Sequence, residues 1–471
     1  MRTITKSLLC VLCTLMGITA NAGDYRVTDF GAKADGITLN TNIIQHAIDH
    51  VSSHGGGNLV FTPGRYLTGT IYLKSDVTLT LENGAELLGS TNPWDYDKSP
   101  VVNWQSLIFA FGQKNIAIRG KGTINGQGAQ TAYNQVDIIN RGLYDDALRN
   151  GRPYEGNRPQ NIYFRECDNV VVEGITVDSK SYWNNDGIDV VDCDGVVIRH
   201  CTIDAADDVF CFKSHSADHI CQNVVVEDCV GRSSANGLKF GTVSRGGFRN
   251  FKVKNLTIYN TYRSAITFAT VDGGIIDNIE VDGVRSINTG NVIFLRTGER
   301  WNKGKRPSMS NITIRNVYAE IPSFKPDAGY SYEGPVEDMP RNISPASIVG
   351  IPTCKIKNVT LQNIEIVTPG GGNPLFAYRG TTAKDLDSIP EMIKSYPEFS
   401  QFKELPAWGF YLRHAENVTF DNIVFRALKH DYRPAIVADD VKGLTLKDMQ
   451  YIEPDSKGKV QEVLYHSTRN K

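Results

Sequence analysis

A short unit that begins with asparagine or glycine recurs along most of this chain. After the first residue come alternating apolar residues and then a short polar turn, as in Asn169-Val170-Val171-Val172. The units begin at Asn115, Asn169, Gly195, Asn223, Asn250, Asn278, Asn311, Asn358, Asn417 and Gly443. Those from residue 169 to residue 278 are spaced by 26, 28, 27 and 28 residues. Because asparagine and glycine tolerate the left-handed backbone of a tight turn, the pattern indicates a stack of similar coils.

This repeat predicts an all-β fold, a single-stranded right-handed parallel β-helix in which each unit forms one coil. Leucine-rich repeats are the main structural alternative, but the leucine pattern that they require is absent. The apolar end of a solenoid needs a cover. An amphipathic helix over Thr41–Ser53 is predicted to supply it as an N-terminal cap. Its apolar residues at helical spacing are Ile44, Ala47, Ile48 and Val51.

Insertions interrupt the regular spacing of the units. They are rich in proline, glycine, tyrosine and charged residues, so we predict surface loops. These stretches are Gly126–Pro159, Gly298–Pro307, Ile321–Ile348 and Gly370–Pro406. In a solenoid such insertions tend to gather on one face and shape a binding cleft. Loops without a function are the alternative.

The N-terminus has the features of a secretory signal peptide. Arg2 and Lys6 provide positive charge, Leu8–Ile18 is apolar, and Ala20-Asn21-Ala22 offers small residues for cleavage. The apolar run is too short to span a bilayer. We therefore predict a signal peptide over 1–22 and one β-helix domain over 23–471. The domain would be exported, to the periplasm if the source is a Gram-negative bacterium and otherwise to the extracellular space.

Composition limits the partners. A formal net charge of −2 and a pI near 6.5 give no reason to expect nucleic acid. Past the signal peptide no apolar segment is long enough for a membrane span, so we expect no membrane partner. The oligomeric state stays open.

Five of the seven cysteines past residue 22 follow the repeat. Cys167, Cys193 and Cys221 each stand two positions before a turn residue of the unit. Cys201 and Cys229 each stand six positions after one. Equivalent positions stack in successive coils, which predicts two interior ladders of small apolar side chains. Disulfides between neighbouring coils are the alternative, and a metal site is disfavoured because this part of the chain has no C-x-x-C pair.

Two acidic patches lie one coil apart. Asp186 and the pair Asp207-Asp208 are separated by 21 residues, close to one repeat. Neighbouring parallel strands lie about 4.8 Å apart, so the three carboxyl groups could converge on one substrate bond. Buried carboxylates repel and desolvate one another, which raises the pKa of at least one. Glycoside hydrolysis by water needs such a split between a protonated and an ionised carboxyl group. Capping of the turns is the alternative role for these aspartates.

The motifs resemble those of the polygalacturonase-type pectinases, family 28 of the glycoside hydrolases, from about Val27 to Ile452. Asn184-Asn185-Asp186-Gly187-Ile188-Asp189 resembles the N-[TN]-D-G-x-D motif of that family. The stretch Asp207–Ser214 resembles its D-D-x-x-x-x-K-S motif. Ala235–Thr242 falls at the place of its G-H-G-x-x-x-G-S motif.

The resemblance implies an inverting glycoside hydrolase that needs no cofactor and no metal. Asp207 would protonate the leaving oxygen, and Asp186 and Asp208 would activate water on the opposite face of the sugar. The partner would be a pectic poly- or oligosaccharide. The candidate substrate-binding residues are Asn184, Trp183, Lys213, Asn236, Lys239, Arg245 and Arg296. Packing for Trp183 and a solvated surface charge for the cations are the alternatives.

Three features depart from the family pattern. Asn236 stands in place of the motif histidine and cannot titrate near neutral pH. Aligning the coils puts Ile266-Thr267-Phe268 where the family has an R-I-K triplet that binds the substrate carboxylate. The segment between Val177 and Asn184 is also about one coil shorter than in the family. Arg263 or Arg296 could restore the lost pairing.

These departures and the insertions predict a specificity. We expect an enzyme that trims the chain ends of a branched or unusual pectic glycan, of the rhamnogalacturonan type, and is poor on plain polygalacturonan. A calcium-dependent pectate-lyase-like enzyme and a non-catalytic carbohydrate-binding β-helix are the alternative functions. Asp186, Asp207 and Asp208 match the hydrolase order better than a lyase, which clusters acidic ligands for calcium and needs arginine or lysine as a base. A binding β-helix would have aromatic residues along the groove without the carboxylate trio.

Overall fold

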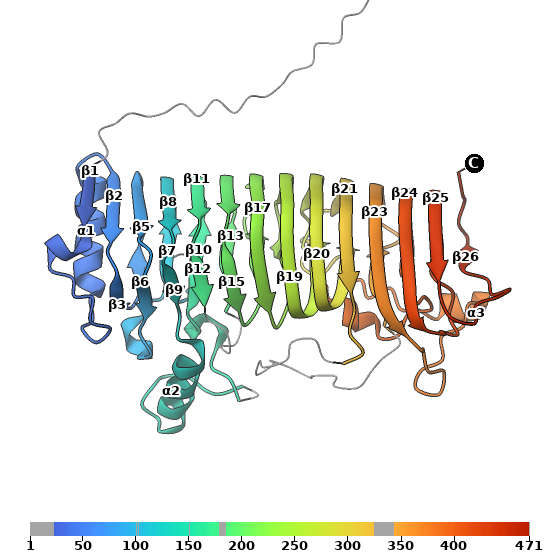
Figure 1. The fold of residues 1–471 in the computed structure, drawn as a ribbon, viewed down its shortest axis with the longest axis horizontal. Helices are drawn as coiled ribbons and strands as arrows, with labels where there is room; N and C mark the ends of the chain where they lie inside the picture. The colour runs from blue at the N-terminus through green and yellow to red at the C-terminus, as the bar shows by residue number, and fades with distance from the viewer. Residues whose placement is uncertain are drawn as a thin grey trace, which may run out of the picture.

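The computed structural model describes residues 23–99, 101, 103–149, 151–178, 185–324 and 343–470 (Figure 1). Its elements, in chain order, are β1 (Gly23–Arg26), η1 (Val27–Phe30), α1 (Thr41–Ser53), β2 (Gly57–Phe61), β3 (Gly64–Thr68), β4 (Ile71–Tyr72), β5 (Val77–Leu81), β6 (Ala85–Gly89), η2 (Pro93–Asp95), β7 (Ser106–Phe111), β8 (Lys114–Gly120), β9 (Thr123–Asn125), α2 (Gly128–Asn140), η3 (Glu155–Asn157), β10 (Gln160–Arg165), β11 (Asp168–Glu173), β12 (Thr176–Asp178), β13 (Ile188–Val191), β14 (Asp194–Arg199), β15 (Thr202–Ala205), β16 (Phe210–Ser214), β17 (Cys221–Ser233), β18 (Leu238–Ser244), β19 (Gly247–Thr270), β20 (Ile275–Thr297), β21 (Ser308–Glu320), β22 (Ala346–Val349), β23 (Ile356–Gly370), α3 (Ala383–Asp387), η4 (Phe399–Phe402), β24 (Phe410–Lys429), β25 (Ile436–Ile452) and β26 (Glu462–Tyr465).

The strands pair in parallel from coil to coil and form three faces of one right-handed β-helix. The first face contains β2, β5, β8, β11 and β14, and the second contains β3, β6, β9, β12 and β15. The third face contains β4, β7, β10, β13 and β16. Later strands are longer and bend from one face to the next. For example, β19 pairs with β17 over 248–259 and with β18 over 266–268. The predicted fold class is confirmed.

One apolar core runs the length of the coil stack. Alternate residues of each strand point inward, as the pairing of Val170, Val196 and Val224 in successive coils shows. The helix α1 covers the N-terminal end of the stack (Figure 1). The helix spans the predicted residues. Its buried residues are the four apolar ones that the sequence placed at helical spacing.

Left-handed turn residues repeat in register along the stack. Every unit of the sequence repeat begins at a residue with a positive φ, for example 57° at Asn169 and 58° at Asn250. The asparagine side chains also bond to one another between coils. Asn250 Nδ2 donates to Asn223 Oδ1 over 3.0 Å, and Asn278 Nδ2 donates to Asn250 Oδ1 over 2.7 Å. The repeated asparagine therefore both permits the turn and links neighbouring coils.

The cysteines form the predicted ladders. The Cys167 N–H donates to Cys193 Sγ over 3.4 Å, and the Cys201 N–H donates to Cys229 Sγ over 3.4 Å. All cysteines in the described part of the chain are buried and free, so none of them is paired in a disulfide.

Two of the insertions contain helices where the sequence predicted only loops. The helix α2 occupies part of 126–159, and α3 with η4 occupies part of 370–406. The insertion at 321–348 lies mostly outside the described residues. Among the helices that the structure describes, none is long and apolar enough to cross a membrane.

Candidate active site

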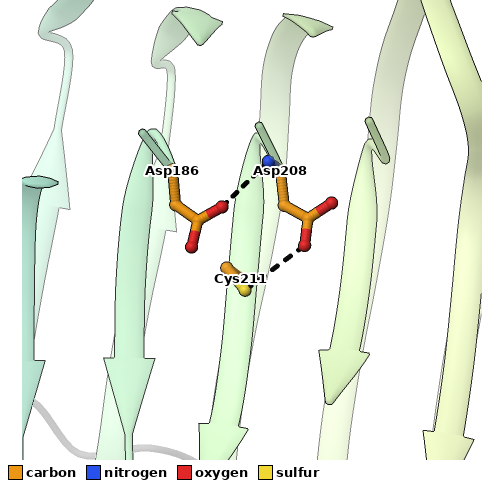
Figure 2. Close-up of side chains that lie close together, drawn as sticks. All are labelled: Asp186, Asp208 and Cys211. Carbon is orange, nitrogen blue, oxygen red and sulfur yellow. Dashed lines mark hydrogen bonds between the residues drawn. The ribbon is translucent and has the colours of Figure 1, made fainter. Parts of the chain in front are cut away.

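Asp186 and Asp208 lie at the same turn of two neighbouring coils. Each stands two residues before a third-face strand, β13 or β16, and these strands pair with Ile188 opposite Phe210. The Asp208 N–H donates to Asp186 Oδ1 over 2.9 Å, as Figure 2 shows. The spacing of one coil between the acidic patches therefore becomes direct contact.

A buried lysine sits between two of the aspartates. Lys213 Nζ donates to Asp186 Oδ2 over 2.7 Å and also to Asp189 Oδ1. Burial raises the pKa of the Asp186 carboxyl well above its usual range; Lys213 opposes this, and the charges of Asp189 and Asp208 add to it. Burial alone would lower the pKa of Lys213, but Asp186 and Asp189 outweigh it and raise that pKa well above its usual value. Lys213 therefore stays an ammonium ion.

Asp208 is held from the other side by Asn236. The Asn236 N–H and side-chain Nδ2 both donate to Asp208 Oδ1, over 3.0 and 2.7 Å. Asn236 Oδ1 accepts from Thr267 Oγ1 over 3.0 Å and from the Ser264 N–H over 3.2 Å. These contacts fix the orientation of the amide, so its donor side faces Asp208. Two departures from the family pattern, Asn236 and Thr267, are thus in direct contact.

Asp207 is half-buried, and its N–H donates to the Asn185 carbonyl over 3.2 Å. It lines a cavity of about 550 Å³ together with Asp186 and Asp208. The other lining residues are Trp104, Arg152, Glu155, Gln160, Ala206, Lys213, His215, Ser234, Ala235, Thr242, Val243, Arg263, Arg300, Trp301 and Tyr396. The three aspartates expected to act together therefore share one cavity.

Three insertions supply walls of this cavity. Arg152 and Glu155 come from 126–159, Arg300 and Trp301 from 298–307, and Tyr396 from 370–406. The expectation that insertions gather around a cleft is confirmed for these three. A larger groove, of about 670 Å³, lies elsewhere over the second face, beside Asn255 and Asn316. It contains none of the expected site residues.

The other candidate residues have different positions. Lys239 is buried, and its Nζ lies 5.4 Å from the centroid of the Tyr396 ring. Arg245 Nη1 donates to the carbonyl of His215, one of the lining residues, over 3.3 Å. Asn184 and Trp183 lie outside the described residues, so their substrate-binding roles stay predictions.

Arg296 is not among the residues that line the cavity. Only 2% of it is exposed, and its guanidinium donates to the carbonyls of Val349, Gly350, Glu391 and Met392. Burial, its main influence, lowers its pKa to about 10. These contacts tie the insertion at 370–406 to the coil, so the structure gives Arg296 a packing role in place of the expected substrate contact. Arg263 lines the cavity with its Nε 3.0 Å from Glu398 Oε1.

Several lining residues were not anticipated. Trp104 faces Lys213, whose Nζ lies 5.5 Å from the ring centroid. His215 stands two residues after Lys213, but burial and the nearby cations, Lys213 first, lower its pKa to about 3. It is therefore neutral near pH 7 and is not a proton donor there. Tyr396 and Arg300 come from insertions, where the repeat offers no register to place them.

Asp186, Asp208 and Cys211 form a group with metal-ligand chemistry. One carboxylate oxygen of each aspartate and Cys211 Sγ all lie within 4.8 Å of one another (Figure 2). Burial raises the pKa of the Cys211 thiol well above its usual value, and a neutral thiol is a poor ligand. Calcium prefers several oxygen ligands, and the Asp186 carboxylate already forms an ion pair with Lys213. The residues present therefore fit a calcium ion poorly.

Comparisons with known proteins match two family descriptions to this chain. The family described as "Glycosyl hydrolases family 28" matches residues 60–321. A second, described as "Rhamnogalacturonase A/epimerase, pectate lyase-like", matches residues 25–89.

Relatives with similar sequences include a "Probable polygalacturonase" from Vitis vinifera, 26% identical over 60% of this chain and 58% of its own length. An "Exo-poly-alpha-D-galacturonosidase" from Dickeya chrysanthemi is 30% identical over 76% of this chain and 65% of its own length. The chain thus spans less than two thirds of each of these relatives. The solved family 28 exopolygalacturonase of Yersinia enterocolitica shares the fold, with a TM-score of 0.57, 20% identity, and coverage of 95% of this chain and 78% of that one.

Proposed function

Because the chain belongs to family 28 of the glycosyl hydrolases, we propose that it hydrolyses a glycosidic bond in a pectic polysaccharide or oligosaccharide. One observation carries the proposal. Asp186 and Asp208 are in hydrogen-bond contact at one turn, inside the cavity that Asp207 also lines. This gives the three carboxyl groups that an inverting hydrolysis can use.

In the proposed reaction Asp207 is the general acid. It donates its proton to the glycosidic oxygen as the bond to the anomeric carbon breaks. Asp186 and Asp208 orient a water on the opposite face of the sugar, and one of them accepts its proton as the new bond to oxygen forms. Lys213 holds Asp186 through its Oδ2, and Asn236 holds Asp208 through its Oδ1, so both carboxylates have a fixed orientation.

The proposed mode of action is removal of sugars from a chain end. Three insertions contribute walls to the cavity. Such walls support a binding groove that is closed on one side, as removal from a chain end requires. A relative with 30% identity carries the name of an exo-acting enzyme. A rhamnogalacturonan-type substrate is the finer proposal, because the uncharged Ile266-Thr267-Phe268 on β19 stand where the family has its R-I-K triplet. Export by a signal peptide over 1–22 also stays a proposal, since those residues are outside the described part.

The test is a time course on polygalacturonan and on rhamnogalacturonan-derived oligosaccharides, with proton NMR of the first product. We expect single sugars or short units of one size and a first product of inverted anomeric configuration. Retained configuration would contradict the proposed roles of the aspartates. Release of mixed-length oligogalacturonides from polygalacturonan would contradict the chain-end mode.

The same experiment separates the calcium-dependent lyase alternative. A lyase leaves an unsaturated product that absorbs in the ultraviolet, and its activity is lost in EDTA. We expect no such absorbance and full activity after chelation. Carbohydrate binding without any product would instead favour the non-catalytic alternative.

A further inference from the structure

Arg300 lies at the cavity wall in the short insertion that follows β20. Its guanidinium carbon is 3.7 Å from the centroid of the Trp301 ring and 5.5 Å from that of Tyr396. All three side chains line the cavity that holds the aspartates. A cation and two aromatic rings therefore meet beside the proposed reaction centre.

Arg300 is anchored along one edge only. Its Nε lies 3.0 Å from Asp272 Oδ1, and its Nη2 lies 3.2 Å from Asp272 Oδ2. Asp272 is itself held by the Ser244 N–H and hydroxyl, over 3.0 and 3.2 Å. A guanidinium carries five N–H donors in a rigid plane. Among the residues that the structure describes, Nη1 of Arg300 has no hydrogen-bond partner, so this end of a firmly held cation remains open to a ligand.

Three other cations near the site already have protein partners. Lys213 is shared by Asp186 and Asp189, Arg296 binds four carbonyls, and Arg263 pairs with Glu398. On β19 the residue beside Lys239 is Thr267, which carries no charge. Lys239, on the neighbouring strand β18, is a cation too, but it is buried and is not among the residues that line the cavity. Arg300 from the insertion does line the cavity.

We infer that Arg300 binds the carboxylate of an acidic sugar in the substrate, a uronate unit beside the bond to be cleaved. The inference rests on the proposed glycoside hydrolase function and names the sugar class of one subsite. Guanidinium matches carboxylate geometry and forms charge-assisted hydrogen bonds. Trp301 is 52% exposed, so its indole offers flat apolar surface to the sugar ring. A rhamnogalacturonan-type chain contains such uronate units as well as neutral ones, so the inference is compatible with either pectic substrate.

The test measures binding in a chain that turns over slowly. In an Asp207→Asn background, calorimetry compares trigalacturonate with its carboxyl-reduced, neutral counterpart. Arg300→Gln is expected to weaken binding of trigalacturonate by about tenfold or more, as for loss of a hydrogen bond to a charged group. Binding of the neutral counterpart is expected to stay the same, because it has no carboxylate to lose.

Controls separate this effect from a folding defect. Arg300→Gln leaves the buried Asp272 without its cation, so the double variant Arg300→Gln with Asp272→Asn removes the leftover charge. We expect both to lose the preference for the acidic trisaccharide. Arg315→Gln removes an arginine that pairs with Glu280 and Asp282 on another face and should leave both affinities unchanged.

The outcomes distinguish the inference from the function on which it rests. Unchanged trigalacturonate affinity in both Arg300 variants, with pectic glycans still cleaved by the unaltered chain, overturns the inference alone. An equal loss for the acidic and the neutral trisaccharide also overturns it, since the contact would then not be with the carboxylate. An unaltered chain that neither binds nor cleaves any pectic oligosaccharide overturns both.

Discussion

The outward-facing side of the third face changes character along the β-helix although its backbone does not. Register-matched outward residues in successive coils are Asp189, Cys211, Lys239, Thr267, Phe294, Ser347, Tyr411 and Val437. The first four are polar or small, and they belong to the coils beside the cavity that Asp186, Asp207 and Asp208 line. From Phe294 onward the row becomes largely apolar.

The apolar part of this row is covered by the insertion at 370–406. Phe294, Tyr411 and Val437 pack with a separate apolar cluster from that insertion: Leu386, Ile389, Phe399, Phe402 and Leu405. Apolar outward side chains gain from burial, so they draw the insertion onto the face. Charged ones keep the neighbouring surface open for a polar ligand. One strand geometry therefore builds either a covered wall or a cleft, according to the outward side chains.

The largest expected effect lies in the cleft. Asp186→Asn, Asp207→Asn and Asp208→Asn should each lower kcat by about 10²–10⁴-fold, because the amide keeps the shape but cannot transfer a proton. Asp218→Asn, at an exposed position, is the matched control and should turn over normally. Near-normal kcat in all three site variants would show that these aspartates are not catalytic. The cleft would then not differ from the covered wall in its chemistry.

The buried cation of the cleft comes next. Lys213→Met should destabilise the protein by about 3–5 kcal/mol, since it leaves Asp186 and Asp189 buried without their shared partner. It should also move the acid limb of the kcat profile to higher pH. Lys213 lowers the pKa of Asp186, so without it the ionised base appears only at higher pH. Chemical denaturation and a pH profile measure both effects.

A control for this change is Lys114→Met, which removes an exposed lysine paired with Asp168. An exposed pair contributes about 0–1 kcal/mol, so little change is expected. If both lysine variants unfold alike and the acid limb stays in place, the contrast between buried and exposed charge would not hold here.

The covered wall should respond in stability and not in chemistry. Phe402→Ala removes a ring that packs on Phe294 and on the Arg296 guanidinium, at centroid distances of 6.4 and 5.0 Å. We expect a loss of about 3 kcal/mol in unfolding free energy, with kcat per folded molecule unchanged. Leu375→Ala, in the same insertion but 96% exposed, should have no effect. A wild-type unfolding curve for the Phe402 variant would show that this insertion is not held by its apolar contacts.

The smallest effect is expected at the link between Thr267 and Asn236. Thr267→Val removes one hydrogen bond to Asn236 Oδ1, worth about 0.5–1.5 kcal/mol, so kcat should fall by up to about tenfold with KM unchanged. Thr267→Ser keeps the hydroxyl and should retain kcat. An equal loss in both variants would point to packing in place of orientation of the amide.

The sequence by itself determined the parts that repeat: the left-handed asparagine turns, the cysteine ladders and the proximity of Asp186 to Asp208. The physical reason is that each coil stacks on an equivalent one, so a spacing in the sequence converts directly into a neighbour in space. The family also followed from motifs placed on that repeat. The sequence also predicted helix α1, from apolar residues at helical spacing.

Only the tertiary structure decided how the site is finished. Arg300 and Tyr396 could not be assigned to the cavity, because insertions have no coil register from which to place them. Arg296 lies on β20, but its packing role depends on carbonyls of the insertion at 370–406, which the sequence could not place. Likewise, the sequence alone could not show Lys213 between two carboxylates or Thr267 bound to Asn236. Such contacts depend on side-chain directions and burial across coils, and these are set when the whole stack packs together.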